Sequence, residues 1–381
     1  MTLPLLPDLH LTGARVLRPC GLTEAPLGLA DGRLVEGCPG RAVDLSGWWV
    51  LPGIVDAHGD GFERHLAPRR GALRDLGDGL AMAAAELAVN GITTAMLAQF
   101  FSWEGGMRSP DFAEAMAAAH AALAPSQAVD LRLQLRLEVS LIDAFPRAAA
   151  LIDRHDIRYL VLNDHLPHAA LTAGKKPPRL TGQALKSGRS PEAHLAMMQA
   201  LHDRMAEVPA ALAALIGARS GLLVGSHDDA TPEDRQHWRA LGARVSEFPE
   251  TRAAAAEARA DGDPVVLGAP NVVRGGSHAK KVSAAELVAE GLCTALASDY
   301  HYPAPRQAAL KLASEIGIEA AWGLVSSGPA AMLGLADRGT LEAGKRADLV
   351  ILDPDTGRVG ATISGGRLAW LGAELAPRFI G

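Results

Sequence analysis

The 381-residue sequence predicts an α/β fold, a (β/α)₈ TIM barrel with a small β-sandwich domain formed by both termini. Two observations predict the barrel: eight apolar, strand-like runs cross the middle of the chain, and segments with helical apolar spacing separate several of them. The expected strands are residues 54–58, 92–98, 131–139, 158–164, 221–227, 243–247, 264–270 and 293–299. The clearest helical segments are residues 79–90, 111–124, 192–217 and 307–316. Eight alternating strand and helix units favour a closed barrel over an open sheet.

At both ends of the chain the sequence pattern differs: short apolar stretches are divided by Gly and Pro. The expected strands there are residues 14–17, 27–30, 348–352, 360–363 and 368–371. We therefore expect residues 1–50 and 340–381 to pair into one small β-sandwich domain. Residues 51–339 then form the barrel domain.

Composition narrows the class of protein. Net charge is −6 with acidic and basic residues mixed, so the chain does not resemble a nucleic-acid binder. A basic, apolar leader and an apolar run of ~18 residues are both missing from the sequence, which predicts a cytoplasmic protein without membrane contact. Cys20, Cys38 and Cys293 form no C-x-x-C pair, which fits a reducing compartment.

Ligand-type residues follow the predicted barrel strands. His58 and Asp60 end the first strand two positions apart, so their side chains point to the same face. The other strand-end residues of this type are Glu138, Asp164, His165, His227 and Asp299. Because functional residues of these barrels lie at the C-terminal strand ends, imidazoles and carboxylates should converge there on a divalent cation.

This order of His-x-Asp, an acidic residue, two histidines and a final Asp resembles the amidohydrolase superfamily. Residues 339–350 look like its C-terminal return into the small β-sandwich. Residues 58–65, 225–229, 268–278 and 298–300 are similar to one branch, the alpha-D-ribose 1-methylphosphonate 5-triphosphate diphosphatase family of the carbon–phosphorus lyase pathway. The resemblance implies hydrolysis of a triphosphate to a 5-phosphate, with release of pyrophosphate.

The resemblance also implies roles for the strand-end residues. It makes His58, Asp60, Glu138, His165 and His227 metal ligands of one or two divalent ions. Asp299 would bind metal, orient water or act as the general base. Zn, Mn, Fe and Ni all suit such ligands, with zinc favoured. Two cations about 3.5–4 Å apart, bridged by Glu138, can clamp attacking and leaving oxygens and lower the pKa of bound water.

Residues 271–281 are the expected phosphate contact. Arg274 and His278 flank a Gly-Gly pair that lets backbone N–H groups approach an anion, and Asn271 and Lys280 are assigned to the same surface. The alternatives are a plain turn for the glycines and a solvated helix start for Lys280 and Lys281.

For several other polar residues near the strand ends, two roles stay open. Glu63, Arg64 and His65 either line the substrate pocket or form an ion pair at the barrel rim. Asp228 and Asp229 either support the metal-bound histidines or cap a helix, and Asp164 is expected as a supporting partner.

The chain departs from the branch pattern at Ala279–Lys281 and Leu166–His168, both on loops expected to face substrate. The latter lies in residues 166–190, which we expect as a long loop because it is rich in Pro, Gly, Lys and Arg. The strand count also places His165 after the fourth strand and His227 after the fifth, whereas the superfamily usually uses the fifth and sixth. Either the count slips by one or a ligand is shifted.

Two other functions stay open: an amidohydrolase acting on a C–N bond (amide, cyclic imide or deamination), and a non-catalytic ligand-binding barrel. The expected partner is a small phosphorylated substrate, and by analogy with similar barrels a second copy of the chain in a homodimer.

Overall fold

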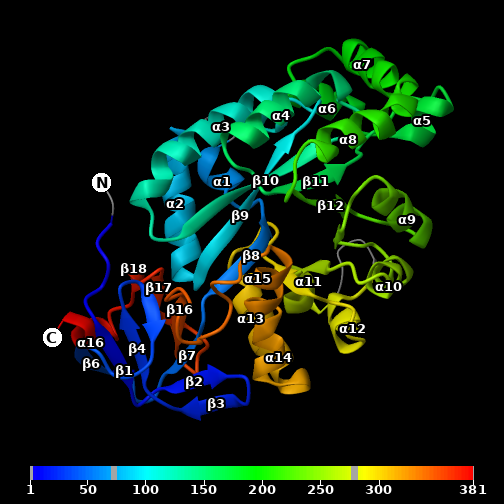
Figure 1. The fold of residues 1–381 in the computed structure, drawn as a ribbon. Helices are drawn as coiled ribbons and strands as arrows, with labels where there is room; N and C mark the ends of the chain where they lie inside the picture. The colour runs from blue at the N-terminus through cyan, green and yellow to red at the C-terminus, as the bar shows by residue number, and fades with distance from the viewer. Residues whose placement is uncertain (1–2, 70–74, 276–281, 381) are drawn as a thin grey trace.

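The computed structural model describes residues 3–69, 75–275 and 282–380, and its central element is a parallel barrel (Figure 1). The eight strands are β8 (Ile54–Gly59), β9 (Ile92–Phe101), β10 (Asp130–Glu138), β11 (Tyr159–Asn163), β12 (Leu223–His227), β13 (Val245–Glu247), β14 (Val265–Gly268) and β15 (Ala295–Ala297), paired in chain order. A parallel bridge between Gly59 and Asp299 joins the last strand to the first. The Asp299 amide donates to His58 O at 3.0 Å and the Asp60 amide to Asp299 O at 2.9 Å. The predicted fold class is confirmed.

The strand order also shows which barrel strands carry His165 and His227. His165 follows β11, the fourth barrel strand, and His227 ends β12, the fifth. The sixth strand, β13, ends instead in Glu247. The count therefore does not slip, and a carboxylate stands at the end of the sixth strand.

Helices cover the outside of the barrel (Figure 1). Their bounds are α1 (Glu63–Leu66), α2 (Leu76–Val89), α3 (Pro110–Leu123), α4 (Phe145–Arg154), α7 (Pro191–Asp203), α8 (Val208–Gly217), α9 (Pro232–Ala240), α10 (Arg252–Ala260), α11 (Ala269–Arg274), α12 (Ala284–Ala289), α13 (Ala304–Ile316), α14 (Ile318–Gly323) and α15 (Ser327–Met332). Sequence-encoded caps start several of them: Ser109 caps α3, Ser190 caps α7, and Thr231 forms a capping box with Asp234 on α9.

Residues 192–217 are helical as predicted, and they are divided into α7 and α8 because Pro209 lacks an amide hydrogen and is tolerated only in the first turn of α8. The loop prediction was wrong. Residues 166–190 are not a plain loop, since they contain α5 (His168–Thr172) and α6 (Leu180–Lys186). Their Leu171 and Leu180 pack into a buried cluster with Trp103 and Met198, which come from distant segments.

The two ends of the chain share a six-stranded sheet, in the order β18-β17-β16-β7-β2-β3, beside a four-stranded sheet, β5-β4-β1-β6. The strands are β1 (Leu9–Thr12), β2 (Arg15–Arg18), β3 (Gly21–Glu24), β4 (Leu27–Ala30), β5 (Arg33–Val35), β6 (Arg41–Asp44), β7 (Trp49–Pro52), β16 (Leu349–Leu352), β17 (Val359–Ser364) and β18 (Arg367–Leu371), with α16 (Ala376–Ile380) at the end. Antiparallel pairing of β7 with β16 joins the termini directly. The domain division at residues 50 and 51 falls inside β7 and stays a prediction.

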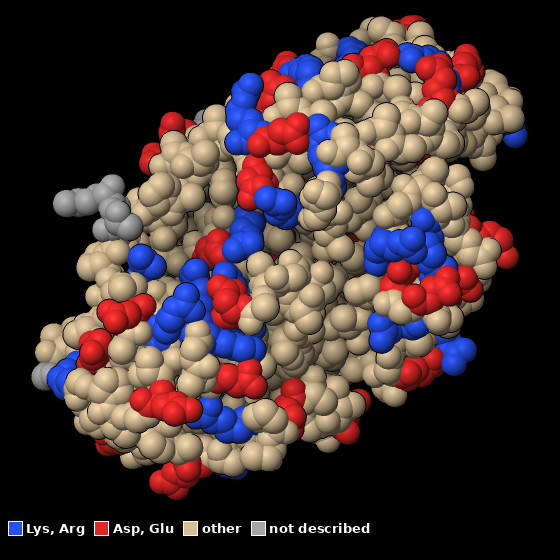
Figure 2. All heavy atoms as spheres, viewed as in Figure 1, with Lys and Arg blue, Asp and Glu red and all other residues tan. Residues whose placement is uncertain are grey.

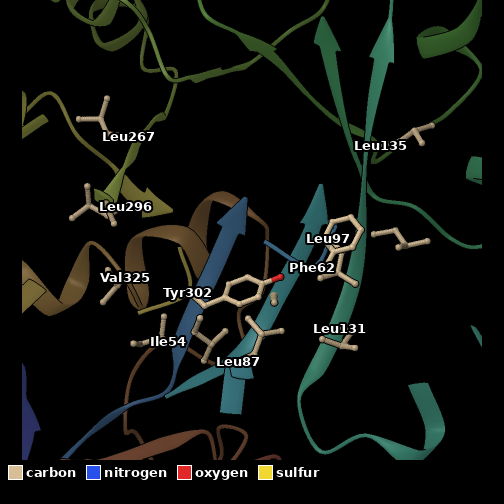
Figure 3. Close-up of a cluster of buried hydrophobic side chains, with 14 of the residues drawn as sticks. Ile54, Phe62, Leu87, Leu97, Leu131, Leu135, Leu267, Leu296, Tyr302 and Val325 are labelled. Atoms are coloured by element: carbon tan, nitrogen blue, oxygen red, sulfur yellow. The ribbon is translucent and has the colours of Figure 1, made fainter. Parts of the chain in front are cut away.

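Apolar side chains fill both sides of the barrel wall. Outside, Ile54, Leu97 and Leu131 belong to the cluster between strands and helices (Figure 3). Inside, Ala57, Tyr159, Val266 and others form a second cluster, which closes the barrel interior below the C-terminal mouth. The site must therefore open at that mouth.

The surface drawn in Figure 2 carries acidic and basic side chains interspersed with each other, without a continuous basic stripe on that face. Among the described residues, no helix combines the length and apolar character needed to cross a bilayer.

Candidate metal centre at the barrel mouth

A cavity of about 400 Å³ opens at the C-terminal ends of the barrel strands. Seven of the residues predicted for the site line it: Asp60, His165, His227, Asp228, Asn271, Arg274 and Asp299. His58 and Glu138 are fully buried. The structure therefore brings the strand-end residues to one end of the barrel, as parallel strands require.

His58 is held from behind by Glu247. The Nδ1 atom of His58 lies 2.8 Å from Glu247 Oε2, and both side chains are fully buried. Tyr159 Oη and Gln134 Nε2 each donate to Glu247 Oε1 at 2.7 Å. Burial alone would raise the pKa of Glu247, but the adjacent His58 imidazole holds it below its ordinary value. With Nδ1–H donated to the carboxylate, the lone pair of His58 is on Nε2.

Glu138 and His165 form a second group on neighbouring strands. Glu138 Oε1 contacts His165 Nδ1, and Glu138 Oε2 accepts from the Trp103 indole and from the His165 amide, each at 3.2 Å. Glu104 Oε1 lies 3.4 Å from the same imidazole nitrogen. Burial opposes protonation of His165, but the hydrogen bond with Glu138 and the nearby carboxylates raise its pKa.

Arg136 lies between the two groups. Its guanidinium donates to His227 Nε2 at 3.1 Å and to Asn163 Oδ1 at 3.4 Å, and it lies 3.8 Å from Asp60 Oδ2. Burial, followed by the charge of Arg136, lowers the pKa of His227 to about 4. His227 is therefore neutral, the form in which imidazole binds metals.

Asp299 has the properties of a proton acceptor. Burial and the neighbouring Asp60 carboxylate raise the pKa of Asp299 to about 6. Its backbone φ of 55° is uncommon for a residue with a side chain, as are the φ values of Asp228 (61°) and Phe248 (52°) at two other strand ends. Strained backbone of this kind clusters at functional sites.

Of the residues predicted to contact phosphate, the structure describes Arg274 and Asn271. The guanidinium of Arg274 contacts the Tyr300 hydroxyl and lines the cavity. Asn271 also lines it, but its amide joins two backbone positions: Oδ1 accepts from Ala284 N at 3.1 Å and Nδ2 donates to Val282 O at 3.3 Å. His278 and Lys280 lie outside the described residues, as does the departure at Ala279–Lys281.

Of the rim residues 63–65, Arg64 and His65 follow the ion-pair alternative, and the substrate-pocket interpretation of Glu63 stays a prediction. Arg64 and His65 both bind Glu86 of α2, and Arg64 also donates to Tyr300 O at 2.9 Å. This arrangement is the ion-pair alternative. Glu63 is largely buried, and burial together with Asp60 raises its pKa.

Asp164 and Asp228 have different neighbours. Asp164 Oδ2 lies 2.8 Å from His168 Nε2, and His168 Nδ1 is 2.7 Å from His202 Nδ1, so Asp164 supports α5. Asp228 Oδ2 lies 3.1 Å from His227 Nδ1, the place of a supporting partner.

Asp229 does not cap the helix that follows it, since Thr231 has that role. Asp229 instead pairs with the fully buried Arg235 at 3.2 Å, and it accepts hydrogen bonds from Ser226 and Ser246 at 2.9 and 2.6 Å.

Four residues near this mouth were not predicted from the sequence: Glu104, Arg108, Arg136 and Glu247. Glu247 was accessible to the same strand-end rule, because it ends the predicted strand 243–247. Arg136 lies two positions before Glu138 on β10, and strand alternation places both on one face.

The donor set fits a divalent cation. His58 Nε2 is buried and has no hydrogen-bond partner among the described residues. Ligand atoms of His58, His227 and Glu247 lie within 4.8 Å of one another, and so do those of Glu104, Glu138 and His165. Neutral imidazoles beside several carboxylates are the donors that such ions prefer. For His227 to serve as a ligand, its hydrogen bond with Arg136 must break.

Comparisons with known proteins agree with this fold. The model of the Amidohydrolase family matches residues 62–368. The chain is similar to the alpha-D-ribose 1-methylphosphonate 5-triphosphate diphosphatase of Escherichia coli (strain K12), with 31% identity over 326 residues, covering 82% of this chain and 85% of that protein.

Two solved structures share the fold at low identity. The beta-aspartyl dipeptidase of Fervidobacterium islandicum AW-1 has a TM-score of 0.61 and 14% identity, over 96% of this chain and 97% of that chain. The dihydropyrimidinase of Brevibacillus agri NCHU1002 has a TM-score of 0.55 and 14% identity, over 96% and 95%.

Proposed function

The chain belongs to the amidohydrolase family, and from this premise we propose that it is a metal-dependent diphosphatase. The substrate would be ribose 1-methylphosphonate 5-triphosphate, converted to the 5-phosphate and pyrophosphate in phosphonate catabolism. The similarity to the Escherichia coli enzyme supports this substrate. That the chain is a hydrolase of this family does not depend on which substrate it cleaves.

One observation carries the proposal. The same cavity presents imidazole and carboxylate groups suited to a cation and three guanidinium groups, those of Arg108, Arg136 and Arg274. Guanidinium groups bind phosphoryl oxygens with paired N–H donors, whereas a neutral amide substrate offers no such anion.

The side chains of the chain have distinct tasks in this reaction. His58, Asp60, Glu138, His165 and His227 would hold one or two divalent ions, with zinc favoured, and such ions supply Lewis acidity and water of lowered pKa. Glu247 fixes the tautomer of His58. Asp299, with its pKa raised to about 6, is ionised near neutral pH and accepts a proton from the attacking water. The arginines neutralise charge that develops on the phosphoryl oxygens.

The test is a panel of sugar and nucleoside triphosphates incubated with protein loaded separately with Zn, Mn, Fe or Ni. We expect equimolar pyrophosphate and 5-phosphate, greatest with the methylphosphonate sugar, and no release after chelation. Release of orthophosphate alone, or equal rates with and without metal, would refute the proposal.

A C–N hydrolase is the second candidate, because one wall of the cavity is apolar. Pro249, Leu267, Pro270 and Leu287 line it. Such a wall suits a heterocycle or a peptide side chain. The same metal-loaded preparations should be assayed for ammonia release and for cleavage of cyclic imides and dipeptides. Turnover there without pyrophosphate release would favour this candidate.

A further inference from the structure

The ring of Phe100 is stacked between two arginines. The guanidinium carbon of Arg136 lies 3.9 Å from the ring centre and that of Arg108 lies 4.0 Å from it. Two guanidinium groups this close to one ring centre must lie on opposite faces, because on one face they would overlap. Phe100 belongs to β9, Arg136 to β10 and Arg108 to the turn after β9, so the stack spans two adjacent strand ends.

All three side chains of the stack line the cavity at the barrel mouth. Phe100 is 2% exposed and Arg136 is 5% exposed, so ring and guanidinium are held rigidly in the wall. Stacking on an aromatic face leaves the N–H groups at the edge of a guanidinium available for an anion. The ring thus fixes two cations at a set separation.

Both Arg108 and Arg136 keep N–H groups that donate to no protein acceptor among the described residues. In hydrogen bonds among the described residues, Arg108 uses only Nη1, which contacts both Glu104 oxygens at 2.8 and 3.0 Å. The carboxylate nearest to Arg136 is Asp60, at 3.8 Å. A guanidinium buried with so distant a counter-ion is costly unless another anion completes its pairing.

Resting on the proposed function, we propose that Arg108 and Arg136 form a subsite for two phosphoryl groups of one polyphosphate chain. Two cations on opposite faces of one ring can each contact a different phosphoryl group of a polyphosphate chain, whereas orthophosphate offers a single phosphoryl group to both. The pair would therefore determine specificity for triphosphates over monophosphates, and hold the pyrophosphate portion that leaves.

The test measures binding of pyrophosphate and of orthophosphate to the metal-loaded protein by calorimetry. Arg108→Ala should weaken pyrophosphate binding about 10- to 100-fold, as expected for loss of one charge-assisted contact, and orthophosphate binding much less. Arg136→Lys should act in the same direction, because lysine keeps the charge and loses the planar stack. The matched control is Arg132→Ala, from the same strand four residues earlier, where the side chain pairs with Asp130 at 3.0 Å and leaves pyrophosphate affinity unchanged.

Metal content and thermal unfolding should be measured for every variant, and both should match the wild type in Arg108→Ala. Unchanged pyrophosphate affinity in that variant would overturn the subsite, as would an equal loss for both ligands or a loss of bound metal. The proposed function is tested separately. If the wild-type protein binds pyrophosphate through Arg108 but does not hydrolyse triphosphates, the subsite stands and the diphosphatase activity is refuted.

Discussion

Replacing Glu247 with Gln tests how the barrel prepares His58 for a cation. Three donors converge on the Glu247 carboxylate: His58 Nδ1 at 2.8 Å, and Tyr159 Oη and Gln134 Nε2 at 2.7 Å each. The glutamine amide has nearly the same volume but only one oxygen. If its NH₂ group faces His58, Nδ1 must accept and Nε2 becomes protonated, so the imidazole can no longer bind a cation.

The expected loss of metal affinity follows from the loss of this partner of His58 Nδ1. Loss of a partner that orients a ligating imidazole lowers metal affinity by about 10- to 100-fold, or about 1.4–2.7 kcal/mol. The fold should survive, because with NH₂ facing His58 the amide oxygen takes the place of Oε1 and still accepts from Tyr159 Oη and Gln134 Nε2.

Metal affinity should be measured by competition with a chromophoric chelator, and the tautomer of His58 by ¹⁵N NMR. We expect weaker binding in Glu247→Gln and a larger share of the Nε2–H tautomer in the metal-free protein. Asp348→Asn is the matched control, because Asp348 is also a buried carboxylate but lies in the terminal sheet region, bound to Arg346 and the Gly365 amide. Wild-type metal affinity in Glu247→Gln would refute the reasoning.

The remaining predictions concern proton transfer, ligation and stability. Asp299→Asn should abolish turnover while leaving the fold and most bound metal, as measured by steady-state assay and elemental analysis; full activity would remove Asp299 from the mechanism. His227→Ala should lower the metal stoichiometry, and an unchanged ratio of metal to protein would exclude it as a ligand. Asp229→Ala should destabilise the protein by about 3 kcal/mol, because it removes the nearest counter-ion of the buried Arg235 and leaves only Asp263 at 3.6 Å, and an unchanged denaturation midpoint would contradict this.

The barrel could be predicted because its information is local. Each strand is a short and largely apolar run, several are followed or ended by a His, Asp or Glu, and eight such runs leave few alternative folds. The boundary between α7 and α8 was also encoded locally, in Pro209, and was overlooked. The helices α5 and α6 were harder to predict, because Leu171 and Leu180 share a buried cluster with Trp103, which lies far earlier in the sequence.

The site was predictable as a set of strand ends but not as a network. The strand-end rule could have found Glu247, at the end of β13, but could not have shown which residues surround its carboxylate. Its burial results from Tyr159, Gln134 and His58, which are 88, 113 and 189 residues away. The stack of Phe100 between two arginines has the same origin, since no local pattern shows which side chains of adjacent strands will face one ring.

The proposed chemistry requires a cation to be bound where distant strand ends meet. Anomalous diffraction from crystals of the zinc-loaded protein, collected on both sides of the zinc absorption edge, tests this directly. We predict one or two peaks within coordination distance of His58 Nε2, Asp60 and His227, with Glu138 and His165 completing the set. Peaks confined to the protein surface, or an empty mouth at saturating zinc, would contradict it.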